Sequence, residues 1–213
     1  MIIISTYNGK EFLKVLLDDL KNFNISNEKV CIVDNKSSNK LHLDYIEKLK
    51  KENYIILHNP KNSFEVGAYK YALANVNDDF YFCMQDSIHL KEDIFSYVIP
   101  KLTTNNIYTF LTAKNGLYDS NTDRFILSLH YNTFNYSQLL FGCNIFGLHS
   151  VLNKMKEDWF IPINKLDAMA AERALGLVCD KHNIKIESLG IYDPPKSGSP
   201  DGYSFFSKTY AAR

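Results

Sequence analysis

The sequence predicts an α/β protein built on a mainly parallel sheet with helices packed against it. Short runs of β-branched and apolar residues alternate with segments whose apolar residues recur at helical spacing through the first half of the chain. Such alternation is typical of parallel strands joined by right-handed helical crossovers. No linker or internal repeat divides the 213 residues, of which 46% are hydrophobic and 14% aromatic. We therefore expect residues 1–213 to form a single domain with an ample core.

The elements of the first half can be assigned in order. The first strand is expected at Ile2–Ser5, where β-branched residues follow Met1 directly. A polar break then leads into a helix, because apolar residues recur at helical spacing from Phe12 to Leu20. The same reasoning predicts strands at 30–33, 54–59 and 80–84, and helices at 43–51 and 66–75, the last opened by Gly67.

The second half is less regular. Residues 106–134 predict two or three antiparallel strands, with turn signals at Asn115-Gly116 and around Asp119 to Thr122. Residues 167–183 predict a helix, and 184–192 a closing strand. The tail at 193–213 is rich in Pro, Gly and Ser, so we expect a loop or lid there.

Composition excludes several classes of function. The 24 basic and 24 acidic side chains cancel, so no overall field attracts nucleic acid or an anionic membrane. No apolar stretch is long enough for a transmembrane segment, and no leader is visible, so we expect a soluble, cytoplasmic protein. The cysteines are widely separated, which predicts free thiols rather than disulfides or a zinc site: Cys31, Cys83, Cys143 and Cys179.

Short polar residues follow three of the predicted strands. They are Thr6 and Asn8, then Asp34, Asn35 and Ser37, then Gln85, Asp86 and Ser87. Parallel strands end at one edge of a sheet, where ligands of open α/β sheets bind. An aspartate there can accept from a base or ribose, and another can hold a hard divalent cation on a diphosphate. The alternative is that Asp, Asn and Ser simply form turns at strand ends.

Four segments in this order resemble the first half of a GT-A nucleotide-sugar glycosyltransferase of the large inverting family-2-like type. They are "STYNGKEFLKVLLDDL", "CIVDNKSSN", "FEVGAYKYALAN" and "FYFCMQDSIHL", and together they cover residues 2 to about 90. Downstream, "GCNIFGLHSVLNKM" resembles the acceptor-side segment and "AMAAERALGLVCDKHNIKI" the helix with the catalytic acid. The resemblance implies a GT-A fold with a nucleotide-sugar-binding half at 1–100 and an acceptor-binding half at 101–213. It also extends to the amino-terminal glycosyltransferase region of a longer multi-domain protein of a large algal virus, which implies further domains and a host cytoplasm.

The resemblance also implies roles for particular residues. Glu172 takes the position of the catalytic base, with Asp167 as the nearest alternative and Asp158 as a third. Asp86 is the metal ligand, for Mn²⁺ or Mg²⁺. One departure concerns this metal, because Gln85-Asp86-Ser87 has a single carboxylate where the family has two. The residues expected to bind the nucleotide sugar are Thr6, Tyr7, Asn8, Asp34, Asn35, Lys36, Gly67, Lys70, Gln85, Asp86 and Ser87.

The function expected is metal-dependent transfer of a sugar from a UDP-sugar or similar donor to a glycan hydroxyl, with inversion. Two alternatives stay open at this point: a non-catalytic nucleotide- or carbohydrate-binding module, and a nucleotidyltransferase. The pair Asp78-Asp79 precedes its strand, so it is interpreted as a turn at the opposite edge of the sheet rather than as the missing acid. For Trp159, stacking on a base or sugar and packing in the core are both open.

Overall fold

The computed structural model describes residues 1–113, 121–131, 138–192 and 205–208. The main sheet has the order β3-β2-β1-β4-β8-β6-β7, with β9 added alongside β6. Its strands are β1 Ile2–Thr6, β2 Val30–Asp34, β3 Ile55–His58, β4 Phe80–Gln85, β6 Asn106–Ala113, β7 Leu139–Leu140, β8 Ile145–Leu148 and β9 Lys185–Tyr192. A small separate sheet pairs β5 Ile88–Leu90 with β10 Phe206–Lys208.

The first half of the main sheet is parallel, as the alternating pattern predicts. β1 pairs in parallel with both β2 and β4, and β2 with β3. β8 runs antiparallel between β4 and β6, while β9 is parallel to β6. The α/β architecture with a mainly parallel sheet is thereby confirmed.

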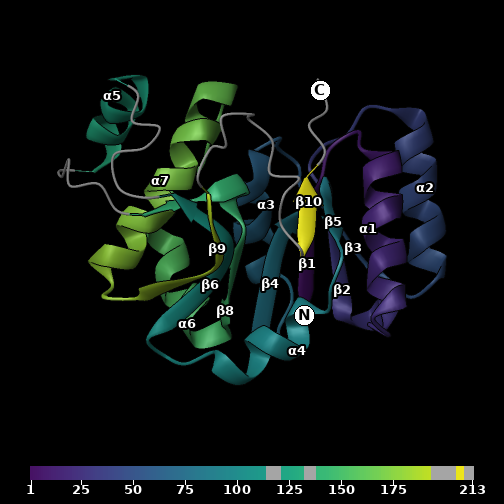
Figure 1. Ribbon diagram of the computed structural model, residues 1–213. Helices are drawn as coiled ribbons and strands as arrows, with labels where there is room; N and C mark the ends of the chain where they lie inside the picture. Colours follow the sequence, from purple (N-terminus) through teal and green to yellow (C-terminus); the bar gives the residue numbers. More distant parts are fainter. Residues whose placement is uncertain (114–120, 132–137, 193–204, 209–213) are drawn as a thin grey trace.

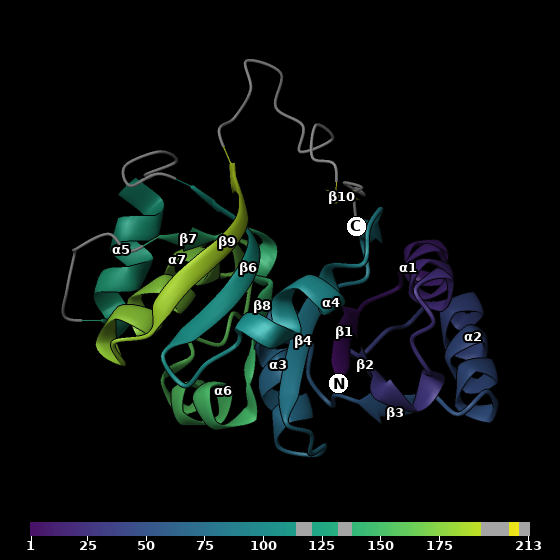
Figure 2. The ribbon, with the colours of Figure 1, turned by 60° about the horizontal axis from the view of Figure 1, so that its bottom comes forward.

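Helices cover both faces of this sheet (Figures 1 and 2). Alternate residues of β1 explain this, because Ile2 and Ile4 belong to one hydrophobic cluster and Ile3 to the other. The helices packed on the first face are α1 Lys10–Asn22, α2 Lys40–Lys51 and α4 Ile94–Val98. On the second face lie α3 Phe64–Leu73, α5 Asn121–His130, α6 His149–Met155 and α7 Lys165–Lys181. Short 3₁₀ turns complete the chain: η1 Asn27–Lys29, η2 Ile99–Lys101, η3 Phe141–Cys143 and η4 Lys156–Asp158.

The prediction of several antiparallel strands over 106–134 is wrong in part. One strand, β6, is present, but residues 121–130 form the helix α5, which packs against α7. Ile126 and Leu127 point inward, whereas Phe125 and Leu129 are each 64% exposed. The clustered apolar residues are compatible locally with the spacing of a strand or of a helix. Packing against α7 favours the helix. The expected turn at Asn115-Gly116 lies outside the described residues.

The tail also differs from its expectation where it is described. Residues 206–208 form strand β10, and Phe206 is fully buried with its ring stacked on Phe110, centroids 4.6 Å apart. The rest of the predicted lid, 193–204 and 209–213, lies outside the described residues. Within the described ranges, no helix combines the length and the apolar character needed to cross a membrane.

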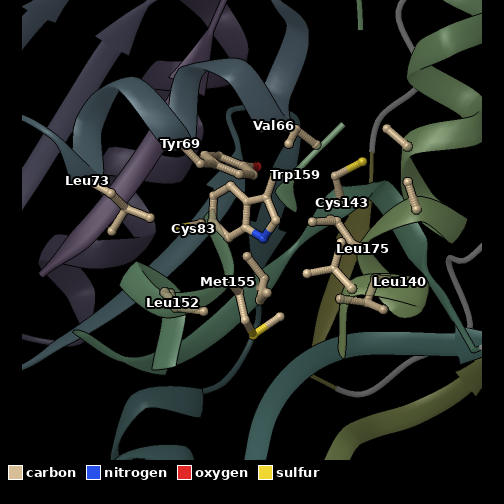
Figure 3. Packing of buried hydrophobic residues seen from close by; sticks show 14 of the residues in the cluster. Val66, Tyr69, Leu73, Cys83, Leu140, Cys143, Leu152, Met155, Trp159 and Leu175 are labelled. Carbon is tan, nitrogen blue, oxygen red and sulfur yellow. The ribbon is translucent and has the colours of Figure 1, made fainter. Parts of the chain in front are cut away.

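Trp159 lies in the core rather than on a ligand-facing surface. It is 4% exposed, and Figure 3 shows its indole between Tyr69 and Val66 of α3 and Met155 of α6. All four cysteines are buried free thiols, as predicted. Burial raises the pKa of the Cys31 thiol to about 12, so this group is a packing residue rather than a nucleophile.

Candidate functional site

The polar ends of β1, β2 and β4 meet at one edge of the sheet. Thr6 lies opposite Asp34, and Ser5 lies opposite Gln85, in the parallel ladders. Asp86 directly follows β4, and its carboxylate accepts a 2.7 Å hydrogen bond from the Thr6 hydroxyl. The strand-end residues singled out in the sequence are therefore neighbours in space, as expected for parallel strands.

Asn8 ties the loop after β1 to the loop after β2. Its φ of 53° lies in the left-handed region that Asn tolerates, and its backbone N–H donates to Ser37 Oγ at 2.8 Å. Its side-chain oxygen accepts from the backbone N–H groups of Ser38 and Asn39, each at 2.9 Å. Asn8 thus shapes the loops with its own side chain. Tyr7 beside it is half-buried, and Lys36 is exposed.

The Asp34 carboxylate is buried beside a backbone N–H and two histidine rings. It is 3% exposed, accepts from the Ser37 backbone N–H at 3.1 Å, and lies 3.3 Å from His58 Nδ1. The fully buried ring of His42 places Nε2 at 3.8 Å from the other oxygen. Neither histidine is marked by a motif in the sequence, because His42 lies on α2 and His58 on β3, away from Asp34 in the sequence.

Asn35 belongs to a buried network that fixes the start of α3. Its side-chain oxygen accepts from Asn59 Nδ2 at 2.8 Å, and its own Nδ2 donates to the Phe64 carbonyl at 2.8 Å. Gly67, in the first turns of α3, leaves room for the Ser63 side chain, because a Cβ on Gly67 would lie 2.1 Å from Ser63 Oγ. In this structure both residues therefore shape the backbone beside the strand ends.

Lys70 is not brought to this edge. It lies in the last turn of α3, and its ammonium pairs with Glu157 at 3.2 Å. Asp78 is at the opposite edge of the sheet, before β4, and accepts from Lys29 at 3.0 Å. The interpretation of Asp78-Asp79 as a turn away from the site agrees with this placement.

The Gln85-Asp86-Ser87 segment turns the chain from β4 into β5. The Gln85 backbone N–H donates to Asn144 Oδ1 at 3.4 Å, and Ser87 Oγ donates to the Gln85 side-chain oxygen at 3.4 Å. Asp86 is 1% exposed, and its carboxylate accepts the hydrogen bond from the Thr6 hydroxyl. Asn144, which the sequence analysis did not select, thereby connects the second half of the chain to this segment.

Glu172 lies on α7, and its side chain contacts η3. Its half-buried carboxylate accepts a 2.7 Å hydrogen bond from the Gly142 backbone N–H. Burial raises the pKa of this carboxyl from 4.5 to about 7, while the charge of Lys208 and the Gly142 N–H act in the opposite direction. A carboxylate with a pKa near neutrality is suited to general-base work.

The other two candidate bases have structural partners. Asp167 accepts from the Ile163 backbone N–H at 3.2 Å and from Asn164 Nδ2 at 3.0 Å, at the start of α7. Asp158 lies 2.6 Å from Lys181 Nζ and 2.7 Å from His182 Nε2. Hydrogen bonds from Lys181 and then His182 hold the Asp158 pKa below its usual value. Asp167 is thus engaged in capping α7, and Asp158 in an ion-pair cluster.

Gly142 is the residue that aims its N–H at Glu172, and we expect Gly142→Ala to disrupt this arrangement. Its φ is +68°, and a Cβ would lie 2.8 Å from Asn144 Nδ2 and 3.0 Å from Lys208 Nζ. A non-glycine residue in this conformation costs on the order of 1–3 kcal/mol. Gly142→Ala should lower the free energy of unfolding by that amount in urea titrations, whereas Gly9→Ala, at a negative φ of −105°, serves as the comparison variant. A Gly142→Ala protein as stable as the parent would contradict the strain argument.

The family model described as "Glycosyl transferase family 2" matches residues 1–136. The chain belongs to glycosyl transferase family 2. The GT-A fold implied by the resemblance to this family is confirmed. No curated protein sequence matches the chain.

Solved structures of nucleotide-sugar enzymes share the fold of this family 2 chain. TarS 1-349 of S. aureus in complex with UDP-GlcNAc has a TM-score of 0.58 and 13% identity, covering 100% of this chain and 58% of that one. Mannosyltransferase PcManGT of Pyrobaculum calidifontis, with GDP-Man and Mn²⁺, has a TM-score of 0.60 and 12% identity, with coverages of 92% and 57%. GalNAc-T7 with UDP, GalNAc and Mn²⁺ has a TM-score of 0.61 and 10% identity, with coverages of 90% and 43%. The chain thus spans about half the length of these proteins, and at these identities the likeness is one of fold.

Metal-binding capacity at this site of the family 2 chain rests on Asp86. Among residues 1–113, 121–131, 138–192 and 205–208, no group of three or more His, Cys, Asp or Glu side chains is arranged to hold a metal ion. Mg²⁺ and Mn²⁺ accept carboxylate, hydroxyl, water and phosphate oxygens, and a diphosphate supplies several of these. Asp86, with the Thr6 hydroxyl on its carboxylate, fits such an ion provided that the substrate contributes most of the ligands.

Proposed function

We propose that this glycosyltransferase moves a sugar from a UDP-sugar, or a similar nucleotide sugar, to a hydroxyl of a glycan acceptor, with inversion at the anomeric carbon and with Mn²⁺ or Mg²⁺ as cofactor. The observation that carries the proposal is Glu172, whose carboxylate is oriented by the Gly142 N–H at 2.7 Å and has a pKa of about 7. UDP, UDP-GlcNAc and GDP-Man bound to proteins of the same fold support the donor class.

In the proposed reaction, Glu172 takes the proton of the acceptor hydroxyl as its oxygen attacks the anomeric carbon. The bond between the anomeric carbon and the diphosphate oxygen breaks, and its electron pair leaves with the nucleoside diphosphate. Attack from the face opposite the leaving group inverts the configuration. Mn²⁺ or Mg²⁺, when bound, neutralises the charge that develops on the departing diphosphate. Asp86 would hold this ion, and Thr6 would orient the Asp86 carboxylate.

Residues after β1, β2 and β4 would bind the nucleotide sugar. Thr6, Tyr7 and Asn8 form the wall on the β1 side, and Asp34 is placed to accept from the base or ribose. Lys36 and Ser87 are the further polar candidates at this edge. The division into a nucleotide-sugar half at 1–100 and an acceptor half at 101–213, and the longer viral parent protein, stay predictions.

A test of the whole proposal combines binding and transfer. We expect one class of nucleoside diphosphate sugar to raise the melting temperature, by an amount equivalent to about 2.7 kcal/mol at a hundredfold excess over Kd, and more strongly with Mn²⁺ than without. Mass spectrometry should then detect transfer to an oligosaccharide acceptor. No response to any nucleotide would contradict the proposal.

A second candidate function is a binding module without catalysis, which the single carboxylate of Gln85-Asp86-Ser87 favours. The same experiment separates the two candidates. Nucleotide-sugar binding without transfer to any acceptor, and without slow hydrolysis of the donor, would favour the module. Transfer or hydrolysis would favour the enzyme.

Asp34→Asn is expected to weaken UDP binding about 10- to 100-fold, because it removes a buried charged acceptor. The carboxylate also orders Ser37 and contacts His58, so some stability should be lost as well. Calorimetric titration with UDP, beside thermal unfolding, measures both effects. Glu47→Gln is the matched control, because Glu47 lies 3.9 Å from His58 Nε2 but on the outer side of that ring. UDP affinity unchanged in Asp34→Asn would remove Asp34 from the nucleoside site.

A further inference from the structure

Strand β10 brings a lysine into the neighbourhood of the proposed catalytic residues. β10 pairs antiparallel with β5, and Lys208 is the partner of Ile88, which directly follows Ser87. A segment near the end of the sequence therefore lies beside the segment that carries Asp86. Figure 1 shows this strand in yellow beside β5.

The direction of the Lys208 side chain follows from its neighbour in the strand. Phe206 is fully buried and stacks on Phe110 of β6. Residues two apart in a strand point to the same side, so Lys208 also points inward. Its ammonium lies 5.1 Å from the centre of the Phe141 ring, which agrees with this direction.

The inward-pointing ammonium lies where η3 and the end of β4 approach each other. Lys208 Nζ is 3.0 Å, and Gln85 Oε1 is 3.6 Å, from the point that a Cβ on Gly142 would occupy. The Gly142 N–H in turn donates to Glu172. Four elements thus converge here: β4, η3, α7 and β10.

The charges around Lys208 are mainly negative. Burial lowers the pKa of Lys208, while the charges of Glu172 and Glu65 act to raise it and Lys165 to lower it. Of these two carboxylates, Glu172 is the group assigned as base. A cation in this position can interact with an anionic ligand between the strand ends and α7, in the region where the metal-binding segment has a single acid.

We propose that Lys208 is a direct ligand of the donor's diphosphate, so that its ammonium supplies part of the positive charge that a metal ion held tightly by two carboxylates would otherwise provide. The inference rests on the proposed function, because it names a group that binds the leaving diphosphate in that reaction. Charge-assisted hydrogen bonds from an ammonium to phosphate oxygens are short and strong, and they strengthen as charge develops on the leaving group. A lysine that only compensates Glu172 is the competing explanation.

The experiment compares UDP with uridine, which share the nucleoside but differ in the diphosphate. Isothermal titration with each ligand, with and without Mn²⁺, is applied to the parent, Lys208→Ala, Lys208→Met and Lys208→Arg. Lys208→Met keeps an unbranched side chain of similar length without the charge, so it separates charge from packing. Lys48→Ala is the control, because Lys48 is an exposed lysine on α2 paired with Glu52.

We expect Lys208→Ala and Lys208→Met to bind UDP about 10- to 100-fold more weakly than the parent, with uridine affinity unchanged. The loss should be larger without Mn²⁺, and Lys208→Arg should recover most of the affinity. Lys48→Ala should bind both ligands as the parent does.

Other outcomes would overturn the inference. UDP affinity unchanged in Lys208→Met, or an equal loss of UDP and uridine binding in a variant that is folded by circular dichroism, would show that Lys208 does not contact the diphosphate. If the parent binds no nucleotide at all, the proposed function fails first and this inference falls with it. If the parent binds UDP and Lys208 variants match it, the inference alone fails.

Discussion

Glu172→Gln is expected to lower the rate of sugar transfer by about 10² to 10⁴, or roughly 3 to 5 kcal/mol of barrier, because the amide cannot take the acceptor proton. Donor affinity should stay close to that of the parent, since a base for the acceptor hydroxyl need not touch the nucleotide. Product formation by mass spectrometry and donor titration measure the two quantities separately.

Asp167→Asn and Asp158→Asn are the matched carboxylate controls. Asp167 caps the start of α7 and Asp158 pairs with Lys181 and His182, so we expect small losses of stability and near-parent turnover in both. Near-parent turnover in Glu172→Gln, with collapse in one of these two, would move the base there. Weak donor binding in Glu172→Gln would instead indicate a structural residue.

The pKa of Glu172 also predicts a pH profile. A base must be deprotonated, so transfer at low substrate concentration should fall as pH drops below about 7. The stability of the folded protein depends on pH in the opposite direction to the rate of transfer. The pKa of about 7 in the folded protein exceeds the ordinary 4.5, so the folded state binds this proton more tightly. The resulting stabilisation is full below pH 4.5 and is lost as pH rises through about 7.

Glu172→Gln removes that titration. Its free energy of unfolding should therefore increase relative to the parent's as pH rises from about 5 to about 8, because only the parent acquires a buried charge over this range. Urea titrations of both proteins across this pH range measure the difference. A constant difference across the range would argue against the raised pKa.

The second large effect is expected for Asp86→Asn, which keeps the shape of the side chain and removes its charge. Loss of the one carboxylate in Gln85-Asp86-Ser87 should weaken Mn²⁺ binding in the presence of UDP by roughly 100-fold or more, since even residues that only orient metal ligands are worth 10- to 100-fold. Transfer should decline in parallel at limiting Mn²⁺. Binding of Mn²⁺ is followed by electron paramagnetic resonance and transfer by mass spectrometry.

Thr6 offers a matched comparison for Asp86. Its hydroxyl donates to the Asp86 carboxylate at 2.7 Å, so Thr6→Val should weaken Mn²⁺ binding less than Asp86→Asn, and Thr6→Ser should restore it. An unchanged Mn²⁺ requirement in Asp86→Asn would contradict the assignment of Asp86. Asp78 would not be the replacement, because it pairs with Lys29 at the opposite edge of the sheet.

The parallel half of the fold could be predicted because its signals are local. Ile2–Ser5, Val30–Val33 and Phe80–Met84 are apolar runs that end in polar residues, and parallel pairing then requires these ends to meet. The placement of Thr6, Asp34 and Asp86 at one edge follows from that geometry. The helix at 121–130 could not be predicted in this way, since its period is ambiguous until Ile126 and Leu127 meet α7.

The sequence by itself determined the order of strands and helices in the parallel first half, the edge at which the polar loops gather, and the family to which those loops belong. Only the tertiary structure distinguished the three candidate acids from one another. Glu172 differs from Asp167 and Asp158 through burial and the Gly142 N–H, and both come from segments distant in sequence. The same holds for Lys208, whose position depends on β10 pairing with β5. The pKa of a side chain, and the contacts it makes, depend on the residues that folding brings around it. The residues next to it in the chain do not reveal those surroundings.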